Sequence, residues 1–468
     1  MVRPDRTDRP DRTDLARLTA VWKRVAALSW PIAAQSVLRT AMRTTDLVVT
    51  GLISPAAIAA IGIANLYTQF PLFLGIGLGS GSMALTSQDT GRGSTVTRDR
   101  AVSTACAMAV VLGVPFALAG LVLSGPAMAL VGPPAAVVEL GAVYLSVVLV
   151  TAPARQLTLV AVRALQGTGD TMTPMYIRGV ANVCNIVGTV SLGLGLGGLP
   201  RLGVFGVGLA TAASNVLAAA LSVGVLASDR TDISLVVPDD ARIAGQVVAI
   251  AAPKAVEGFA QTAAEFPLNA VLLTFGVNVN AGYHVSRRVF QQVSAPLTRS
   301  VGVVTSILVG QAVGERDASE ATYLGRATAL LGVVVALAIG LGLFLAAPQL
   351  ARVFSEDAGT VGAATFFVRA YAVSVPFVMA FRVFAGALEG GSETRIPFVA
   401  NLTGLLLFML GVPYVGGVVL GYGVPTVGVG IVAFSVWRAA VVGVWFERDG
   451  WIDRADRMMD ARDAASTD

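Results

Sequence analysis

Three carboxylates lie inside strongly apolar stretches of this chain: Asp46, Glu257 and Glu265. An ionisable side chain is expensive in such surroundings and by default indicates a functional site. Asp46 is the strongest candidate, because a lone carboxylate that changes its access to water can change its protonation. We predict that Asp46 is a functional site whose protonation can change with its access to water. The alternative is a structural pair with Arg43, three residues earlier on the same helical face.

Positive charges accompany this carboxylate. Arg39 and Arg43 stand one helical turn apart in the same stretch as Asp46. A guanidinium is always charged and its planar fork matches carboxylate and phosphate groups. The local field therefore favours anions over cations.

The second half of the chain offers a different set. Lys254 and Glu257 are spaced i,i+3, which predicts a structural ion pair. Glu265 lies two turns further along, with Gln261 between them on the same face. We leave two assignments open for Glu265: a structural role, or a group that binds an ion or the substrate.

The composition predicts that these residues lie in segments embedded in a lipid bilayer. Hydrophobic residues make up 55% of the chain and charged residues only 13%, and the mean hydropathy is +0.73. A soluble domain has about a quarter of its residues charged. The chain is therefore predicted to be a membrane protein.

Twelve apolar stretches are long enough to cross a bilayer as helices, which takes about 20 residues each. Their approximate centres are Leu38, Phe73, Leu112, Val148, Cys184, Val216, Ala260, Phe290, Val335, Val373, Leu406 and Phe434. The halves resemble each other, because Gln88 and Gly91 recur 223 residues later as Gln311 and Gly314, and RALQGTGDTMTPM recurs at the same spacing as GALEGGSETRIPF. We predict an all-α integral membrane protein in which twelve transmembrane helices form two six-helix lobes related by a parallel, pseudo-twofold repeat.

Positive charges between the stretches predict the orientation. The odd-numbered connections hold only Arg201 and Arg352, whereas the termini and the even-numbered connections hold many more basic residues. This asymmetry places both termini in the cytoplasm. We expect a disordered cytoplasmic tail at 1–20, an N-lobe at 21–227, an interlobe linker at 228–243, a C-lobe at 244–447 and a cytoplasmic tail at 448–468.

Several classes of protein lack support in the sequence. Cys106 and Cys184 are too few for a disulfide framework or a metal cage, and the one histidine, His284, excludes a multi-histidine metal site. No nucleophile triad or paired carboxylates support an enzyme, no GxxxxGK[ST] supports an ATP-driven pump, and no repeated filter motif supports a channel. The net charge of +4 is explained by membrane orientation, so we expect no nucleic-acid partner and no cofactor.

A series of motifs in a fixed order leads to a known family. They are Pro31 in the first stretch, TTDLVVTGLISPAAIAAIGIA at Thr44–Ala64, Gln-x-x-Gly at the ends of stretches two and eight, RALQGTGDTMTP before stretch five, and LGVFGVGLATAAS leading into stretch six. From about Val21 to Arg448 the chain resembles the multidrug and toxic compound extrusion (MATE) transporters, of the multidrug/oligosaccharidyl-lipid/polysaccharide exporter superfamily. The segments around Asp46 and Asn185 look most like the DNA-damage-inducible (DinF-like) and archaeal branch.

The resemblance implies a V-shaped antiporter that exports organic compounds while H⁺ or Na⁺ enters, through rocking of two lobes around a central cavity. The family's acidic residue on the first helix falls on Asp46, its asparagine on Asn185 and its threonine on Thr211. Where the archaeal branch carries a second aspartate, this chain has Thr189, whose hydroxyl can ligate sodium or relay a hydrogen bond but does not titrate near neutral pH. These four residues form the expected cation-coupling site.

The substrate is where this chain departs from its relatives. Exported compounds of the family are usually cationic or zwitterionic, whereas Arg39 and Arg43 favour an anionic or zwitterionic one, unless Arg43 mimics a bound cation in one state of the cycle. We assign these residues to the substrate cavity: Arg39, Met42, Arg43, Gln69, Gln261, Glu265, His284 and Arg288. The alternative function is a flippase or exporter of lipid-linked or other anionic substrates. In either case we expect a monomer in a prokaryotic plasma membrane, whose partners are the bilayer and a small organic substrate.

Overall fold

The structure is a computed structural model that describes residues 12–448 and 450–466, and all regular elements in this part are helical. The first half of the chain contains α1 (Arg12–Ile53), α2 (Pro55–Gly91), α3 (Thr95–Leu130), α4 (Ala135–Val150), α5 (Ala152–Gly167), α6 (Met172–Leu194) and α7 (Gly203–Leu226). The second half contains α8 (Ala241–Thr274), α9 (Val277–Val293), α10 (Ala295–Gly314), α11 (Ala318–Phe354), α12 (Ala358–Gly390), α13 (Arg395–Gly404), the π-helix η1 (Leu405–Val419) and α14 (Pro425–Phe446), and α15 (Gly450–Ser466) follows.

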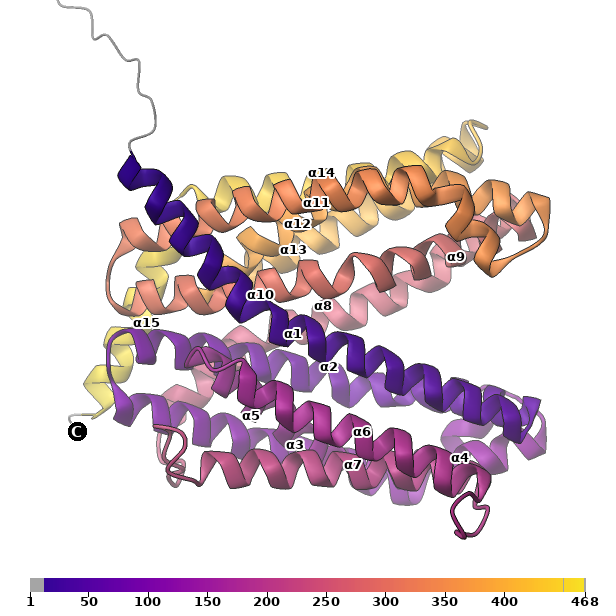
Figure 1. Ribbon diagram of the computed structural model, residues 1–468, viewed down its shortest axis with the longest axis horizontal. Helices are drawn as coiled ribbons and strands as arrows, with labels where there is room; N and C mark the ends of the chain where they lie inside the picture. The colour runs from indigo at the N-terminus through magenta and orange to yellow at the C-terminus, as the bar shows by residue number, and fades with distance from the viewer. Residues whose placement is uncertain (1–11, 449, 467–468) are drawn as a thin grey trace, which may run out of the picture.

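These helices provide the predicted spans. Ten helices in the described part are long and apolar enough to cross a bilayer, and α4 with α5 forms an eleventh span bent by 49°. The less apolar α1 carries Arg39, Arg43 and Asp46, yet it runs beside the other helices across the bundle (Figure 1). All twelve predicted centres fall within helices, and the prediction of an all-α membrane protein with twelve spans in two halves is confirmed.

The two halves break their spans at different prolines. Pro153 lies in the first turn of α5, directly after the bend from α4, whereas its repeat mate Pro376 lies inside the continuous α12. Conversely, Pro71 lies inside the continuous α2, while its mate Pro296 lies in the first turn of α10, directly after α9. A proline removes one backbone donor and clashes with the preceding turn. Neighbouring packing therefore decides whether such a site becomes a break.

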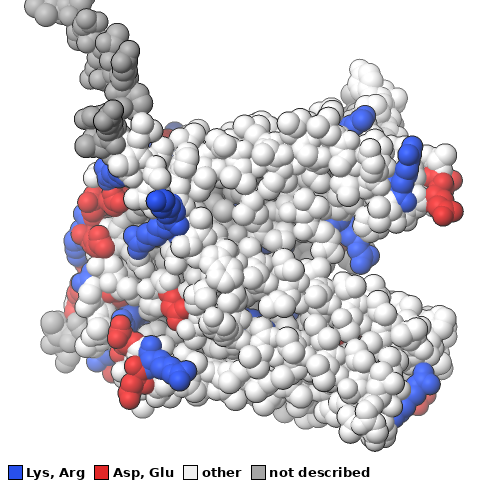
Figure 2. All heavy atoms as spheres, viewed as in Figure 1, with Lys and Arg blue, Asp and Glu red and all other residues white. Residues whose placement is uncertain are grey.

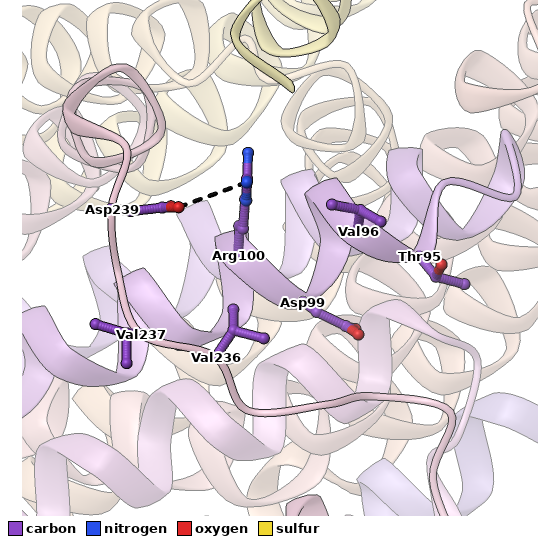
Figure 3. Close-up of a pocket in the computed structure, with 7 residues that line it drawn as sticks. All are labelled: Thr95, Val96, Asp99, Arg100, Val236, Val237 and Asp239. Atoms are coloured by element: carbon purple, nitrogen blue, oxygen red, sulfur yellow. Dashed lines mark ion pairs between the residues drawn. The ribbon is translucent and has the colours of Figure 1, made fainter. Parts of the chain in front are cut away.

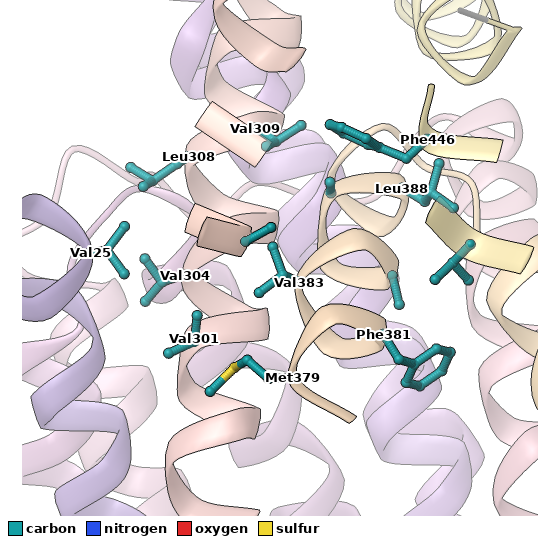
Figure 4. Packing of buried hydrophobic residues seen from close by; sticks show 14 of the residues in the cluster. Val25, Val301, Val304, Leu308, Val309, Met379, Phe381, Val383, Leu388 and Phe446 are labelled. Atoms are coloured by element: carbon teal, nitrogen blue, oxygen red, sulfur yellow. The ribbon is translucent and has the colours of Figure 1, made fainter. Parts of the chain in front are cut away.

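α1 belongs to both halves. Near its start, Val25 shares a buried apolar cluster with Val304 and Leu308 of α10 (Figure 4). Near its end, Val49 packs in another cluster with residues of α2, α4 and α7, including Leu145. Pro31 lies between these two contacts. We expected the N-lobe to begin at residue 21. The structure changes this boundary, because α1 begins on the second half and ends on the first.

α8 crosses between the halves in the equivalent way, from the first half to the second. Its early residues Ile243 and Val247 pack in a cluster with Leu85 and other residues of the first half. Its later residues Leu268 and Leu272 pack in a cluster with α9, α12, η1 and α14. Each half thus sends the start of its first helix into the other half, and this exchange ties the two halves together.

One end of the bundle is closed and the other is open. We call the end where α1 begins and α15 lies the termini end, and the opposite end the far end (Figure 1). At the termini end the Nε2 atom of Gln88 donates to Gly390 O at 2.8 Å, and that of Gln311 donates to Gly167 O at 3.3 Å. These bonds are repeat mates across the two halves. The molecule is hollowed between the halves at the far end (Figure 2).

Both predicted tails need correction. Residues 1–11 lie outside the described residues, but residues 12–20 continue α1, and Arg17 forms an ion pair with Glu320 and lies over the ring of Tyr323. At the other end, α15 folds back onto the termini end, where Trp451 is buried and Arg462 is 1% exposed. These segments looked like polar tails because their charged partners are hundreds of residues away in the sequence.

Candidate functional site

A polar group surrounds Asp46 inside the first half. Thr189 of α6 donates its hydroxyl to Asp46 Oδ1 at 2.9 Å. One turn earlier on α6, Asn185 lies with its amide 3.3 Å from Thr211 Oγ1 and 3.4 Å from Ser214 Oγ, both on α7. The structure therefore brings together all four residues of the expected cation-coupling site, from three helices. Their role in coupling stays a prediction.

Helix geometry explains why these residues meet. Residues four apart on a helix face the same way, so Asn185 and Thr189 both point from α6 toward α1 and α7. Both are completely buried, and Asn185 Oδ1 has no hydrogen-bond partner among the described residues. A buried carbonyl oxygen without a donor is costly. The Asn185 oxygen is an acceptor available to a proton carrier or small cation, one helical turn from Thr189, the hydrogen-bond partner of Asp46.

Positively charged side chains lie near this polar group but form no ion pair with Asp46 among the described residues. Arg43 of α1 is within electrostatic reach of Asp46, but within the described chain no ion pair joins the two. The side chain of Tyr144 on α4 lies near Thr211 and within electrostatic reach of Arg43 and Arg155. Asp46 is thus held by a hydroxyl and not by a salt bridge, which argues against the purely structural Arg43 pair considered above.

The second half holds a denser network around Glu257. Lys254 Nζ lies 3.3 Å from Glu257 Oε2 and 2.6 Å from Glu389 Oε1. Gln261 and Asn401 both donate to Glu257 Oε1, at 3.3 and 3.0 Å. The predicted Lys254–Glu257 ion pair is present, and it extends into a network that includes α12 and α13.

Removing the carboxylate of Glu257 should destabilise the protein. Glu257→Ala leaves Gln261 and Asn401 without their acceptor, and breaking a buried charge network costs about 3–5 kcal/mol. We expect a clear fall in the thermal unfolding midpoint of the purified protein. Glu265→Ala is the matched control, because its side chain is 40% exposed against 9% for Glu257, and its effect should be small. Equal midpoints for the two variants would contradict this assignment.

The remaining predicted cavity residues do not all lie together. Glu265 forms an ion pair with Arg287, and His284 Nε2 lies 2.7 Å from Asn269 Oδ1, so these four form a polar group between α8 and α9. Asn269 is the repeat mate of Asp46, and the two halves therefore use different chemistry at this position. Arg39 and Arg43 lie on α1 with Met42, whereas Gln69 lies on α2 and Arg288 on α9.

Sequence reasoning missed part of the positive charge in the interior. Arg163 on α5 and Arg178 on α6 are within electrostatic reach of Arg39, which they approach from neighbouring helices. The missed signal is the spacing of Arg155 and Arg163, which at eight residues places both on one face of α5. From the sequence, the only arginines assigned to the substrate cavity are Arg39, Arg43 and Arg288.

A small pocket lies elsewhere, where the segment between α7 and α8 runs along the start of α3 (Figure 3). Val96, Val236 and Val237 line it, and Arg100 lies 3.5 Å from Asp239 in an ion pair. Its charges already neutralise each other and it is remote from Asp46. It therefore belongs to the anchoring of the connection between the halves.

The protein-family comparison matches both halves. A family model described as MatE matches residues 31–191 and 253–415. The chain belongs to the MatE family. It is thus a multi-pass membrane transporter rather than an enzyme, as predicted from its motifs. The two matched segments fall in the two copies of the repeat, and each covers the first five spans of its half.

MatE proteins of known name and structure align along most of the chain. Multidrug resistance protein PmpM of Pseudomonas aeruginosa is 26% identical over 445 residues, which covers 92% of this chain and 90% of that protein. A MATE family multidrug resistance transporter solved in an outward-facing conformation has a TM-score of 0.83 at 20% identity, covering 97% and 99% of the two chains. A MOP superfamily transporter from Pyrococcus furiosus, described as having a binding pocket of reverse polarity, has a TM-score of 0.84 at 21% identity. The match covers 93% of this chain and 97% of that chain.

Proposed function

We propose that this MatE protein is a secondary antiporter that exports organic compounds across a prokaryotic plasma membrane in exchange for H⁺ or Na⁺. The single observation that carries the proposal is the Asp46 group: a carboxylate on α1 that accepts a hydrogen bond from Thr189 at 2.9 Å and has no ion-pair partner among the described residues. An ionisable group held in this way inside a membrane protein can bind and release a coupling ion. Multidrug resistance relatives such as PmpM support an organic substrate.

Alternating access is supported by the contrast between the two ends. The halves meet through paired glutamine bonds at the termini end, and the molecule is hollowed at the far end (Figure 2). With both termini in the cytoplasm, as the distribution of basic residues predicts, the hollow opens to the outside. Transport then requires the termini end to open while the far end closes. One chain supplies both halves, so we propose that a monomer suffices.

Asp46→Asn tests the coupling role. The variant keeps the shape and hydrogen-bonding capacity of the side chain but cannot titrate, so gradient-driven export should fall at least tenfold while the protein stays folded. The measurement is dye or fluoroquinolone transport in proteoliposomes with an imposed pH gradient or an imposed Na⁺ gradient. Glu447→Gln is the matched control, because Glu447 lies on the exposed termini end in an ion pair with Arg326. It should transport like the wild type.

The outcomes separate the coupling ion from the coupling site. Stimulation by a pH gradient alone identifies H⁺, and stimulation by a Na⁺ gradient alone identifies Na⁺. Transport by Asp46→Asn at the wild-type rate would move the coupling site away from α1. No gradient-driven transport of any compound by the wild type would contradict the antiporter proposal.

A further inference from the structure

The two glutamines that join the halves at the termini end each accept a hydrogen bond from an arginine. The Oε1 atom of Gln311 accepts from Arg24 Nη2 at 3.0 Å, and that of Gln88 accepts from Arg462 Nη2 at 3.1 Å. Gln88 and Gln311 are repeat mates, and the Nε2 atom of each donates to the opposite half. The two copies of this contact are therefore built alike, although their arginines come from opposite ends of the chain.

The repeat explains why one of these arginines comes from α15. Pro31 and Pro253 are repeat mates, 222 residues apart, and the same offset pairs Arg24 of α1 with Gln246 of α8. A glutamine side chain carries no positive charge, so Gln246 cannot take the role of Arg24. Instead, Gln246 Oε1 accepts a hydrogen bond from Arg462 at 2.7 Å. Arg462 thus supplies the guanidinium that α8 lacks.

Apolar contacts attach α15 to the second half. Trp451, Ile452, Ala455 and Met459 belong to the buried cluster formed mainly by α10, α11 and α12. The indole ring of Trp451 stacks on Phe446 at the end of α14, with ring centroids 5.7 Å apart. Apolar surface that leaves water is the dominant favourable term in protein association. Water cannot replace these contacts, so we expect this side of α15 to stay on the second half.

The contacts of α15 with the first half are mainly polar. Arg462 donates to Asp89 Oδ1 at 3.0 Å, and Asp463 forms an ion pair with Arg92 at 2.8 Å. The start of α8, which packs on the first half, donates to Met458 O at 2.9 Å. Water can take the place of each of these partners, which makes their net contribution smaller than that of buried apolar groups. This side of α15 is therefore the one that can separate.

We propose that α15 is a clamp for the closed termini end: it stays on the second half, and Arg462 binds the first half only while the halves are together. α15 contacts both halves at the end that has to open, so opening must break one of its two attachments. Arg462 is 1% exposed and Asp89 is fully buried. Opening admits water to both groups, whereas closure requires that they pair. This inference rests on the alternating access proposed above and identifies a segment that sets its balance.

A buried serine between the halves offers a reporter of opening. Ser87 of α2 is fully buried, and a Cβ atom on Gly310 of α10 would lie 2.1 Å from its Oγ atom. Ser87→Cys is hidden while the termini end is closed and meets water when it opens. The measurement is the rate at which a water-soluble maleimide labels this variant in nanodiscs, in full-length protein that also carries Cys106→Ala and Cys184→Ala.

Arg462→Ala should raise the labelling rate of Ser87→Cys about tenfold, which corresponds to about 1.4 kcal/mol in the opening equilibrium. Combining Arg462→Ala with Gln246→Arg restores an arginine at the repeat mate of Arg24 and should slow labelling again. Arg457→Ala is the matched control, because Arg457 is an exposed arginine on the same helix. It should leave the labelling rate unchanged.

General loosening of the protein has a different signature. The native Cys106 is buried in the apolar core of the first half and should stay unreactive in Arg462→Ala protein that retains it. Faster labelling of Cys106 as well as Ser87→Cys would overturn the clamp. Equal labelling of Ser87→Cys with and without Arg462→Ala would overturn it too. Fast labelling that persists after Gln246→Arg is added would reject the role of Arg462 as the missing arginine.

Spin labels test which attachment separates. Arg457→Cys places a label on α15, Ser319→Cys places one on α11 of the second half, and Val96→Cys places one on α3 of the first half; all three positions are exposed. With Arg462→Ala the distance from α15 to α11 should keep its distribution, and the distance from α15 to α3 should lengthen and broaden. The reverse pattern would overturn the assignment of the second half as the anchor.

The labelling experiment uses neither a substrate nor an ion gradient, so the clamp and the antiport can fail separately. Gradient-driven export by the wild type, with labelling of Ser87→Cys unaffected by Arg462→Ala, would reject the clamp and leave the antiporter in place. Faster labelling in Arg462→Ala, without any gradient-driven export by the wild type, would reject the antiporter and leave the clamp in place.

Discussion

Replacing Gly314 by alanine is expected to disfavour closure of the two halves at the termini end and to reduce transport about 5- to 150-fold. A Cβ atom on Gly314 would lie 2.0 Å from the backbone oxygen of Gln88, and a Cβ atom on Gly91 would lie 2.0 Å from that of Gln311. These obstacles are backbone atoms, so the helices themselves must move apart. Overpacking of this kind costs about 1–3 kcal/mol, occasionally more, which shifts a two-state equilibrium about 5- to 150-fold.

The effect of Gly314→Ala should be conformational. Spin labels on the two halves at the far end should report a shorter distance in the variant, because opening at the termini end is coupled to closure at the far end. Gly342→Ala is the matched control: Gly342 lies within a membrane span, α11, and has open space around its Cβ position. It should transport and report distances as the wild type does. A Gly314→Ala protein with unchanged distances and transport would show that α2 and α10 do not need this close approach.

The fold was accessible from the sequence because the repeat and the apolar stretches are local signals. The matched Gln-x-x-Gly motifs located the contact between halves without showing what they do; in the structure, Gln88 and Gln311 bond each other's half through Gly390 and Gly167. The exchange of α1 and α8 was not predictable, since a helix that packs on one half at its start and on the other at its end has the same apolar pattern throughout. Prolines at matched positions predicted bends equally in both halves. In the structure, packing interrupts the helix at only one proline of each matched pair.

The site was only partly predictable for a related reason. Asp46, Asn185, Thr189 and Thr211 were grouped through the resemblance to the MATE transporters, and the structure places these four residues close together. Arg163 and Arg178 were missed because they lie near helix ends, where arginines usually extend to the interface. The packing of α5 against α2 and of α6 against α1 directs them inward.

The C-terminal helix α15 was the largest departure from expectation, and its charges join the two halves at the termini end. Arg462 donates to Gln246 Oε1 of α8 at 2.7 Å and to Gln88 Oε1 and Asp89 Oδ1 of α2 at 3.1 and 3.0 Å. On the same helix, Arg454 pairs with Glu393, which follows α12. α15 has a polar composition, yet its buried Arg462 connects it to α2 of the first half and α8 of the second half.

Arg462→Ala is therefore expected to destabilise the closed termini end. It removes three hydrogen bonds and leaves the fully buried Asp89 with Arg92 as its remaining ion-pair partner. Breaking a buried ion pair costs about 3–5 kcal/mol, and we expect a value near the lower limit because Arg92 remains. The thermal unfolding midpoint should fall, and amide hydrogens of α15 should exchange faster with deuterium, because the helix loses its ion pair with Asp89.

A second variant distinguishes the ion pair from the space that the side chain fills. Arg462→Gln with Asp89→Asn removes both buried charges together, so it should recover part of the stability lost in Arg462→Ala, as expected for directly coupled residues. Arg457→Ala is the control on the same helix, where the side chain is exposed and should leave both measurements unchanged. If α15 exchanged equally fast in Arg462→Ala and in the wild type, the helix would be held by its other contacts, such as buried Trp451 and the Arg454–Glu393 ion pair. Faster exchange in Arg462→Ala together with slower exchange in the double variant would instead show that the Arg462–Asp89 ion pair holds α15 in place.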